Sequence, residues 1–347
     1  MKKAIILTSS LLATEDAKTA HGLIRESNRF AIAGVVDATH AGKDAGVILD
    51  GHPRHIPVFA TVKDAVLAVQ PDCCIVGVAT SGGIFPGSLL EEVKDAIRQG
   101  LSVINGLHDL LSEKEEVMAL AAANGVALVD VRKPLRMRDL HFWTGAILSF
   151  PKPIVAVLGT DCSLGKRTTT RFLVNTCKAA GIHAEMIYTG QTGWLQGGKY
   201  GFVLDATPND FVSGELEHAI LTCEKETGAD VLFIEGQAAL RNPSGPCGSE
   251  MLISGGAKWV ILLHSPKRVY YDGKPELGKI HSLSSEIALV EKYGSKVIAV
   301  ALNTEHCDLA EAEGFQRRYE QELNLPVLLP LEQGVEKMIP LIKTLIT

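Results

Sequence analysis

Residues 154–170 read IVAVLGTDCSLGKRTTT. A short apolar run enters a loop that starts at Gly159 and ends at Gly165 and Lys166, and a helix-like segment follows at once. This order is the layout of a phosphate-binding loop. Glycine lets backbone N–H groups approach phosphate oxygens, the helix N-terminus adds a partial positive charge, and lysine reaches the terminal phosphates. The stretch therefore predicts a strand, a phosphate-binding loop and a helix, with a plain glycine-rich connecting turn as the alternative.

The loop departs from the common spacing GxxxxGK[ST] in two respects. Five residues separate Gly159 from Gly165, and Arg167 stands where a Ser or Thr would hold Mg²⁺. Either Thr168 takes that role or the loop holds no metal. Thr and Asp after the first glycine, with this longer spacing, resemble the loop of the dethiobiotin synthetase branch of P-loop proteins. The residues expected to bind the phosphate-bearing ligand are Gly159, Thr160, Asp161, Cys162, Ser163, Gly165, Lys166, Arg167 and Thr168, with Asn303 at a later strand end.

Composition excludes several classes of protein. The chain has 347 residues, enough for two domains, and its 46% hydrophobic and 21% charged residues indicate a globular protein and exclude disorder. A net charge of −6 and a pI near 6.0 argue against nucleic acid or an anionic membrane as the main partner. No apolar run approaches the roughly 20 residues of a membrane span. We therefore expect a cytoplasmic protein with small-molecule substrates; its oligomeric state stays open, a homo-oligomer included.

The seven cysteines form no CxxC pair, and their number is odd. Reduced cytoplasmic thiols fit this pattern better than a disulfide framework or a zinc site. Cys162 lies in the phosphate-binding loop, where it is either a nucleophile or a small loop residue.

The first part of the chain alternates strands with helices. Expected strands cover residues 3–8, 32–36, 73–78, 101–104 and 126–131, and expected helices cover residues 14–27, 63–69, 89–99 and 112–124. This alternation predicts a Rossmann-like, doubly wound parallel sheet over residues 1–135. Asp37 ends the second strand, where a dinucleotide ribose would be held, but the first turn has no GxGxxG, so we do not expect a dinucleotide. His40, Lys43 and His108 follow strand ends and are either substrate contacts or solvated loop residues.

Proline and basic residues at 132–138 mark a break, and residues 136–151 read as a linker. Residues 152–347 then predict a P-loop NTPase-like α/β domain. Its expected strands cover residues 184–188, 231–234, 257–264 and 296–302, and a helix is expected over 213–226. Glu235 directly follows the third apolar strand of this domain, a position at which P-loop proteins hold a metal or a water.

Stretches from both halves together resemble the D-glutamate N-acetyltransferase-like family. They read HAGKDAG (40–46), NGLHDLLS (105–112), GTDCSLGKRT (159–168), TGQTG (189–193), DATPNDFVSGELE (205–217), IEGQ (234–237) and ALNTE (301–305). The resemblance covers nearly the whole chain. It implies a Rossmann-like domain, a P-loop domain and acetyl transfer from acetyl-CoA to the amine of an amino acid such as D-glutamate.

The residues permit this chemistry. Coenzyme A carries phosphates that the loop can bind without a metal. Acetyl transfer further needs a base, a donor for the oxyanion and a cation for substrate carboxylates. The base candidates are Glu235, Asp205, Asp210 and His264, although Asp205 and Asp210 could instead cap the helix near Ser213. The turn at 190–193 offers backbone N–H groups, with Gln191 and Thr192 as substrate contacts, and the carboxylate candidates are Arg241, Lys43 and Arg167.

The main alternative is an ATP- and Mg²⁺-dependent ligase or kinase of the dethiobiotin synthetase type. In that reading Asp161 and Glu235 hold Mg²⁺, Asn303 recognises the base and a substrate carboxylate is phosphorylated. The sequence does not decide whether a metal is bound.

Overall fold

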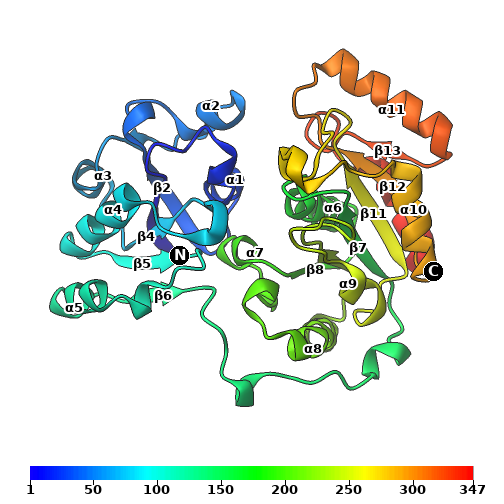
Figure 1. Ribbon diagram of the computed structural model, residues 1–347, viewed down its shortest axis with the longest axis horizontal. Coiled ribbons are helices and arrows are strands. Elements are labelled where there is room, and N and C mark those ends of the chain that lie inside the picture. Colours follow the sequence, from blue (N-terminus) through cyan, green and yellow to red (C-terminus); the bar gives the residue numbers. More distant parts are fainter. Residues whose placement is uncertain (347) are drawn as a thin grey trace. The chain divides into compact units, whose positions relative to one another are not determined.

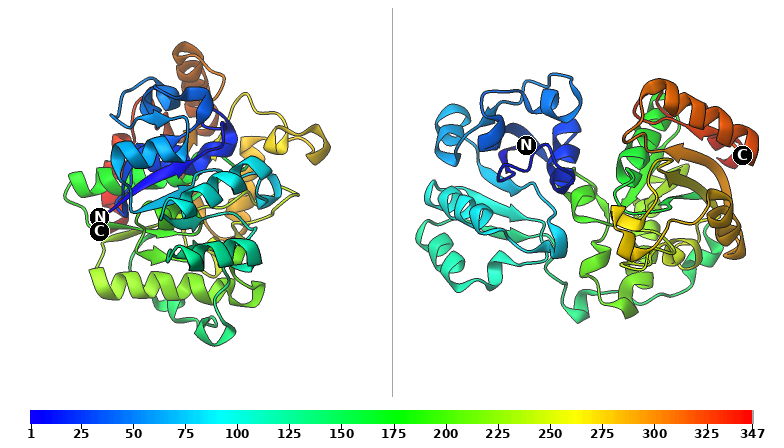
Figure 2. Two further views of the ribbon diagram at one scale, coloured as in Figure 1. Left: turned by 90° about the vertical axis from the view of Figure 1, so that its left-hand side faces the viewer. Right: turned by 45° about the horizontal axis from the view of Figure 1, so that its top comes forward.

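The computed structural model describes residues 1–346 and divides into two compact units. The first unit comprises Met1–Pro134 together with Gln191–Gly197, and the second comprises Leu135–Gly190 and the chain from Gly198 onward. Each unit is an α/β fold built on a parallel sheet, as the sequence predicts (Figures 1 and 2). Among the described residues, no helix is long and apolar enough to cross a membrane.

The sheet of the first unit has the strand order β3-β2-β1-β4-β5-β6, and all its pairings are parallel. The strands are β1 (Lys2–Leu7), β2 (Phe30–Val36), β3 (Val58–Phe59), β4 (Cys73–Val76), β5 (Ser102–Asn105) and β6 (Leu128–Asp130). The helices are α1 (Lys18–Arg25), α2 (Ala45–Asp50), α3 (Val62–Val69), α4 (Gly87–Arg98) and α5 (Glu115–Ala123). Alternate residues of β1 point to opposite faces, so Ile5 packs with α3, α4 and α5, and Ile6 packs with α1.

Helix ends in this unit depend on local capping. Thr14, the first residue of the expected helix over 14–27, donates its hydroxyl to the carbonyl of Leu11, and a 3₁₀ turn at Glu15–Ala17 precedes α1. The unexpected α2 begins after Asp44, whose carboxylate accepts the backbone N–H groups of Gly46 and Val47.

The sheet of the second unit has the order β13-β12-β11-β7-β10-β8-β9, again all parallel. The strands are β7 (Ile154–Gly159), β8 (Ala184–Tyr188), β9 (Tyr200–Gly201), β10 (Val231–Glu235), β11 (Trp259–His264), β12 (Lys296–Leu302) and β13 (Val327–Leu328). Every residue of the central strand β7 is buried, because helices cover both faces of the sheet.

Two layers of helix pack on this sheet. The helices are α6 (Lys166–Ala179), α8 (Asn209–Thr227), α9 (Ser249–Ile253), α10 (Leu283–Lys292), α11 (Leu309–Leu323) and α12 (Ile339–Ile346). Val155 and Val157 of β7 pack with α6 and α12, whereas Ala156 and Leu158 pack with the helices of the opposite face. Helix α8 begins at Asn209, four residues before the expected start, because Pro208 presets the backbone that enters it.

Residues 136–151, expected to be a linker, are part of the second unit. Glu215 and Glu217 of α8 accept the backbone N–H groups of His141 (2.7 Å) and Thr144 (2.6 Å). A β-carbon on Gly214 would lie 2.0 Å from the carbonyl oxygen of His141, so only glycine permits this approach. These carboxylates replace the hydrogen bonds that an extended segment would otherwise make with water.

The segment Gln191–Gly197 was expected in the P-loop domain but groups with the first unit. It contains the short helix α7 (Gln191–Leu195). Gln196 donates to the carbonyl of Gly22 at 2.7 Å, and the hydroxyls of Thr19 and Thr192 lie 3.1 Å apart. These contacts join residues about 170 positions apart in sequence, which local patterns do not reveal.

Candidate functional site

The loop between β7 and α6 has the strand–loop–helix arrangement that the sequence predicts. Gly165 takes a φ of 91° and lets the chain turn into α6. Lys166 is the first residue of that helix, and its buried Nζ donates to the carbonyl of Asp161 at 2.6 Å. A β-carbon on Gly159 would lie only 3.3 Å from this Nζ. The glycines thus allow the lysine to fold over the loop, while phosphate binding itself stays a prediction.

Asp161 connects this loop to two other segments of the second unit. Its Oδ1 accepts the side-chain amide of Asn242 at 2.9 Å, and its Oδ2 accepts Arg268 at 3.0 Å and the backbone N–H of Asp272 at 2.9 Å. Arg268 also donates to the carbonyl of Cys162 and pairs with Glu305 through two bonds of 2.7 Å. The carboxylate is fully buried and paired, so it fixes the loop in place.

Sequence reasoning missed Arg268, Asn242 and Glu305. They lie 81 or more residues after Asp161, within no recognisable motif of their own. Glu305 does fall within the stretch ALNTE that carried part of the family resemblance, and that position was the one available signal.

Thr160 connects the loop to the end of β11. Its hydroxyl lies 3.0 Å from Nδ1 of His264, a buried residue. Burial, aided by the charge of Arg318, lowers the pKa of His264 to about 4. The imidazole is therefore neutral near pH 7 and forms a hydrogen bond with Thr160. A group with so low a pKa is a weak base for the proton of an ammonium group.

Glu235 ends β10, which pairs directly with β7 in the sheet. Its carboxylate is 4% exposed and accepts the backbone N–H of Thr189 at 3.1 Å. Burial raises the pKa of Glu235, while the charges of Arg167 and Lys166 and backbone hydrogen bonds from Thr189 and Gly190 oppose that rise. The carboxylate thus lies within the field of both loop cations. Glu235 thus ends the strand that neighbours β7, and its role in catalysis stays a prediction.

A group of possible metal ligands, Asp161, Cys162 and Asp272, lies within 4.8 Å among the described residues. It fits a divalent cation poorly. Both oxygens of Asp161 already accept hydrogen bonds, and Oδ2 of Asp272 accepts from Asn242 and Ser244. Burial raises the pKa of the Cys162 thiol to about 11, so the thiol is protonated at neutral pH. The same pKa argues against a thiolate nucleophile at this position.

Other predicted residues of the second unit have different surroundings. Asp205 and Asp210 are exposed, and Asp210 lies inside the first turn of α8, so neither caps the helix at Ser213. The guanidinium of Arg241 pairs with the buried Glu286 at 2.9 Å and donates to Ser285. The side-chain oxygen of Asn303 accepts the backbone N–H of Glu305. Arg241 and Asn303 therefore have structural partners, which reduces their availability to a ligand.

Three of the predicted substrate residues of the first unit lie in loops that follow its strands, and the other two, Gln191 and Thr192, lie in α7. His40 follows β2 and bonds through Nδ1 to Asp37 at 2.9 Å, whereas Lys43 and His108 are exposed. Gln191 accepts Arg132 at 2.8 Å, and Thr192 contacts Thr19. A role of these five residues in substrate binding stays a prediction.

Family models match both units. A model described as a domain of unknown function, DUF1611_C, P-loop domain, covers residues 141–339, and the Rossmann-like DUF1611_N model covers residues 38–134. The chain belongs to the DUF1611 family. A crystal structure of a DUF1611 family protein from Anabaena variabilis superposes with a TM-score of 0.88 and 27% sequence identity over 99% of both chains.

Two curated relatives are named D-glutamate N-acetyltransferase. The protein from Tritonibacter scottomollicae is 30% identical over 299 residues, which is 84% of this chain and 87% of the relative. The protein from Pseudoalteromonas sp is 28% identical over 271 residues, which is 76% of this chain and 79% of the relative. The family resemblance inferred from sequence motifs is therefore confirmed, as is the α/β fold with Rossmann-like and P-loop domains.

Proposed function

We propose that this chain transfers the acetyl group of acetyl-CoA to the amine of an acidic amino acid, with D-glutamate as the expected substrate. The observation that carries the proposal is the arrangement around β7: two loop cations, Lys166 and Arg167, act on a buried carboxylate, Glu235, at the end of the adjacent strand. The names of the curated relatives support the same reaction.

Phosphate binding is assigned to Lys166, Arg167 and the backbone of the loop. A guanidinium and an ammonium complement the pyrophosphate of CoA without a metal. An ATP-dependent ligase of the kind considered above would need Asp161 for Mg²⁺. Because Arg268, Asn242 and the backbone of Asp272 already use the oxygens of Asp161, the geometry favours the metal-free ligand.

Glu235 is assigned as the general base. Its raised pKa brings the carboxylate closer to the operating pH, at which a base accepts a proton from an ammonium group most effectively. One proton of the substrate ammonium passes to Glu235 and then to solvent. The free amine attacks the thioester carbonyl carbon, a C–N bond forms and the C–S bond breaks. The second amine proton ends on the departing sulfur as the free thiol of CoA.

The test is an assay of the purified chain with acetyl-CoA and D-glutamate in the presence of EDTA. We expect free thiol, together with N-acetylglutamate identified by mass spectrometry, and a lower rate with L-glutamate. Parallel reactions contain ATP and Mg²⁺ in place of acetyl-CoA. Formation of ADP without thiol, or activity that disappears on chelation, would overturn the proposal in favour of ATP chemistry.

A further inference from the structure

A cavity of about 470 Å³ in the second unit lies beside the phosphate-binding loop. Two residues of its wall contact that loop directly. Arg268 donates to the carbonyl of Cys162 at 2.8 Å, and His264 bonds to the hydroxyl of Thr160 at 3.0 Å. The cavity has the size of a small-molecule site, and a ligand with phosphates on the loop could place its next group there.

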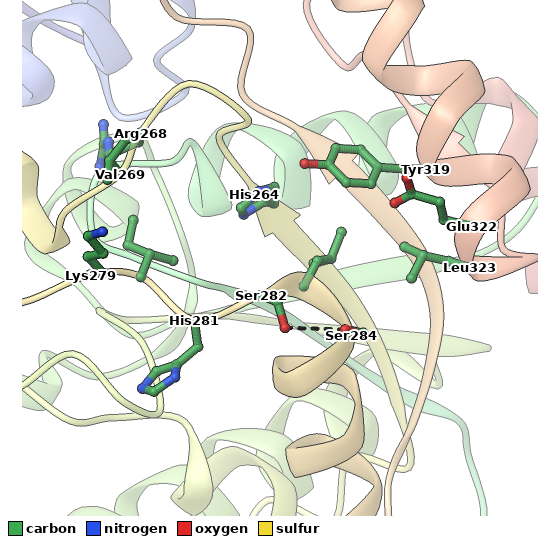
Figure 3. A pocket seen from close by; sticks show the side chains of 12 residues that line it. His264, Arg268, Val269, Lys279, His281, Ser282, Ser284, Tyr319, Glu322 and Leu323 are labelled. Carbon is green, nitrogen blue, oxygen red and sulfur yellow. Dashed lines mark hydrogen bonds between the residues drawn. The ribbon is translucent and has the colours of Figure 1, made fainter.

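Part of the cavity wall is apolar and aromatic. Tyr319 of α11 meets His264 edge to face, with ring centroids 5.8 Å apart, and Leu283 and Leu323 add aliphatic surface. Figure 3 shows His264 between Tyr319 and Leu323 on one side and Arg268, Val269 and Lys279 on the other. Because His264 stays neutral, this wall suits an uncharged heteroaromatic ring such as a nucleobase.

The opposite part of the wall carries polar and cationic side chains. Arg268 is compensated by Asp161 and Glu305, and Glu322 contributes a negative charge on the α11 side. Lys279 and His281 are exposed cavity residues on the segment that leads into α10, next to the hydroxyls of Ser282 and Ser284. These residues bring an ammonium, an imidazole and hydroxyls to one cavity wall, and such groups bind phosphate monoesters.

We propose that this cavity binds the 3′-phosphoadenosine end of CoA, with the adenine against Tyr319 and the 3′-phosphate at Lys279 and His281. The proposal rests on the proposed function, since the pyrophosphate must occupy the adjoining loop. On the adenosine part of the two molecules, the 3′-phosphate is present in CoA and absent from ATP. The cavity would therefore select the cosubstrate, whereas the loop would bind the phosphates common to both.

The test is calorimetric titration of the purified chain with CoA, 3′-dephospho-CoA and ATP, all in EDTA. We expect the wild type to bind CoA about 10- to 100-fold more tightly than dephospho-CoA. The double variant Lys279→Ala/His281→Ala should lose that preference and keep its affinity for dephospho-CoA. Lys274→Ala is the matched control, because it removes an exposed lysine from the same segment outside the cavity wall, and it should retain the preference.

Equal affinity of the wild type for CoA and dephospho-CoA would overturn the cavity assignment. So would a double variant that keeps the preference for CoA, or one whose affinity for both ligands falls by the same factor. These outcomes would not contradict the proposed acetyl transfer, since thiol release is measured independently. Conversely, a preference for CoA that depends on Lys279, without any acetylation of D-glutamate, would support the cavity and refute the proposed reaction. Tighter binding of ATP than of CoA would refute both.

Discussion

In each unit a loop follows the first strand of the sheet, but the two loops differ in the charged residues that they contain. In the first unit the loop over residues 8–12 follows β1, and in the second the loop over residues 159–165 follows β7. Each strand lies inside a parallel sheet, and each loop touches a fully buried aspartate, Asp37 or Asp161. Topology alone would allow either loop to be a ligand site.

The aspartates act in opposite ways. Asp37 comes from outside its loop and accepts the backbone N–H of Leu12 at 2.9 Å and the hydroxyl of Thr8 at 2.8 Å. It therefore occupies donors that an anionic ligand would need. Asp161 belongs to its loop and is held from outside by Arg268, and Lys166 supplies a second cation. The comparison leads us to expect phosphate binding only at the second loop, whose own carboxylate is neutralised by a cation from outside the loop.

Removing the side chain that pairs with each aspartate should give the largest difference. Arg268→Leu leaves Asp161 buried with neutral donors only, and we expect it to lower the free energy of unfolding by about 3–5 kcal/mol. His40→Leu removes one bond from Asp37, which retains Thr8 and Leu12, and should cost about 1 kcal/mol. Hydrogen exchange of residues 154–159 and 2–7 assigns each loss to its unit. Similar losses in both variants would contradict the contrast between the two loops.

Lys166→Ala should remove the function of the second loop without unfolding it. If Lys166 binds the phosphates of CoA as proposed, its loss should lower kcat/KM for acetyl-CoA by about 10³-fold and abolish thermal stabilisation by CoA. Lys178→Ala is the control, since Lys178 is exposed on the same helix and pairs with Glu185. A full thermal shift in the Lys166 variant would show that the loop does not bind the phosphates.

The sequence predicted this loop because its signals are local. An apolar strand, a glycine at Gly165 and Lys166 at a helix start lie within a few residues, and the order of elements limits the fold to parallel sheets. The partners of Asp161 were not predicted, since the contact with Arg268 spans 107 positions and follows from the packing of whole elements. The same holds for Gln191–Gly197, whose place in the first unit depends on side chains from the start of the chain.

Glu235→Gln tests the general base against a second buried carboxylate. The amide keeps the size of the side chain but cannot accept the ammonium proton, so kcat should fall by about 10²-fold with little change in KM. Glu92 of α4, in the first unit, also has a raised pKa, and Glu92→Gln should leave turnover unchanged. The measurement is thiol release at saturating acetyl-CoA. Near-normal turnover in the Glu235 variant would return the role of base to Asp205 or Asp210.

Site assignment from sequence was less complete than fold assignment. The strand-end position of Glu235 could be predicted from the sequence, because a carboxylate directly after an apolar strand adds nothing to the hydrophobic core. The pairing of Arg241 with Glu286 could not be predicted from the sequence, since a guanidinium in a polar loop can bind either a ligand or a buried carboxylate. Burial and partner identity decide between those roles, and neither is encoded in residue spacing.

The smallest expected effect concerns Glu92 itself. Burial raises the pKa of this carboxyl to about 7, against an ordinary value of 4.5, although hydrogen bonds from Ser9 oppose the rise. Between these two values the folded chain binds more protons at Glu92 than the unfolded chain does. The free energy of unfolding therefore falls as the pH rises from about 4.5 to about 7, and stays at the lower level above that.

Glu92→Gln should remove this pH-dependent loss of stability, because the amide carries no charge at any pH. After discounting for partial solvation, we expect the variant to be about 1 kcal/mol more stable than the wild type at pH 8, equivalent to about 2–4 °C in Tm, and equally stable near pH 4.5. Thermal unfolding from pH 4.5 to 8 measures the difference, with the exposed Glu115→Gln as control. Parallel profiles for wild type and variant would mean that Glu92 ionises at its ordinary pKa. In that case Glu92 and Asp37 would both be charged at neutral pH. The surroundings of the loop after β1 would then carry two negative charges.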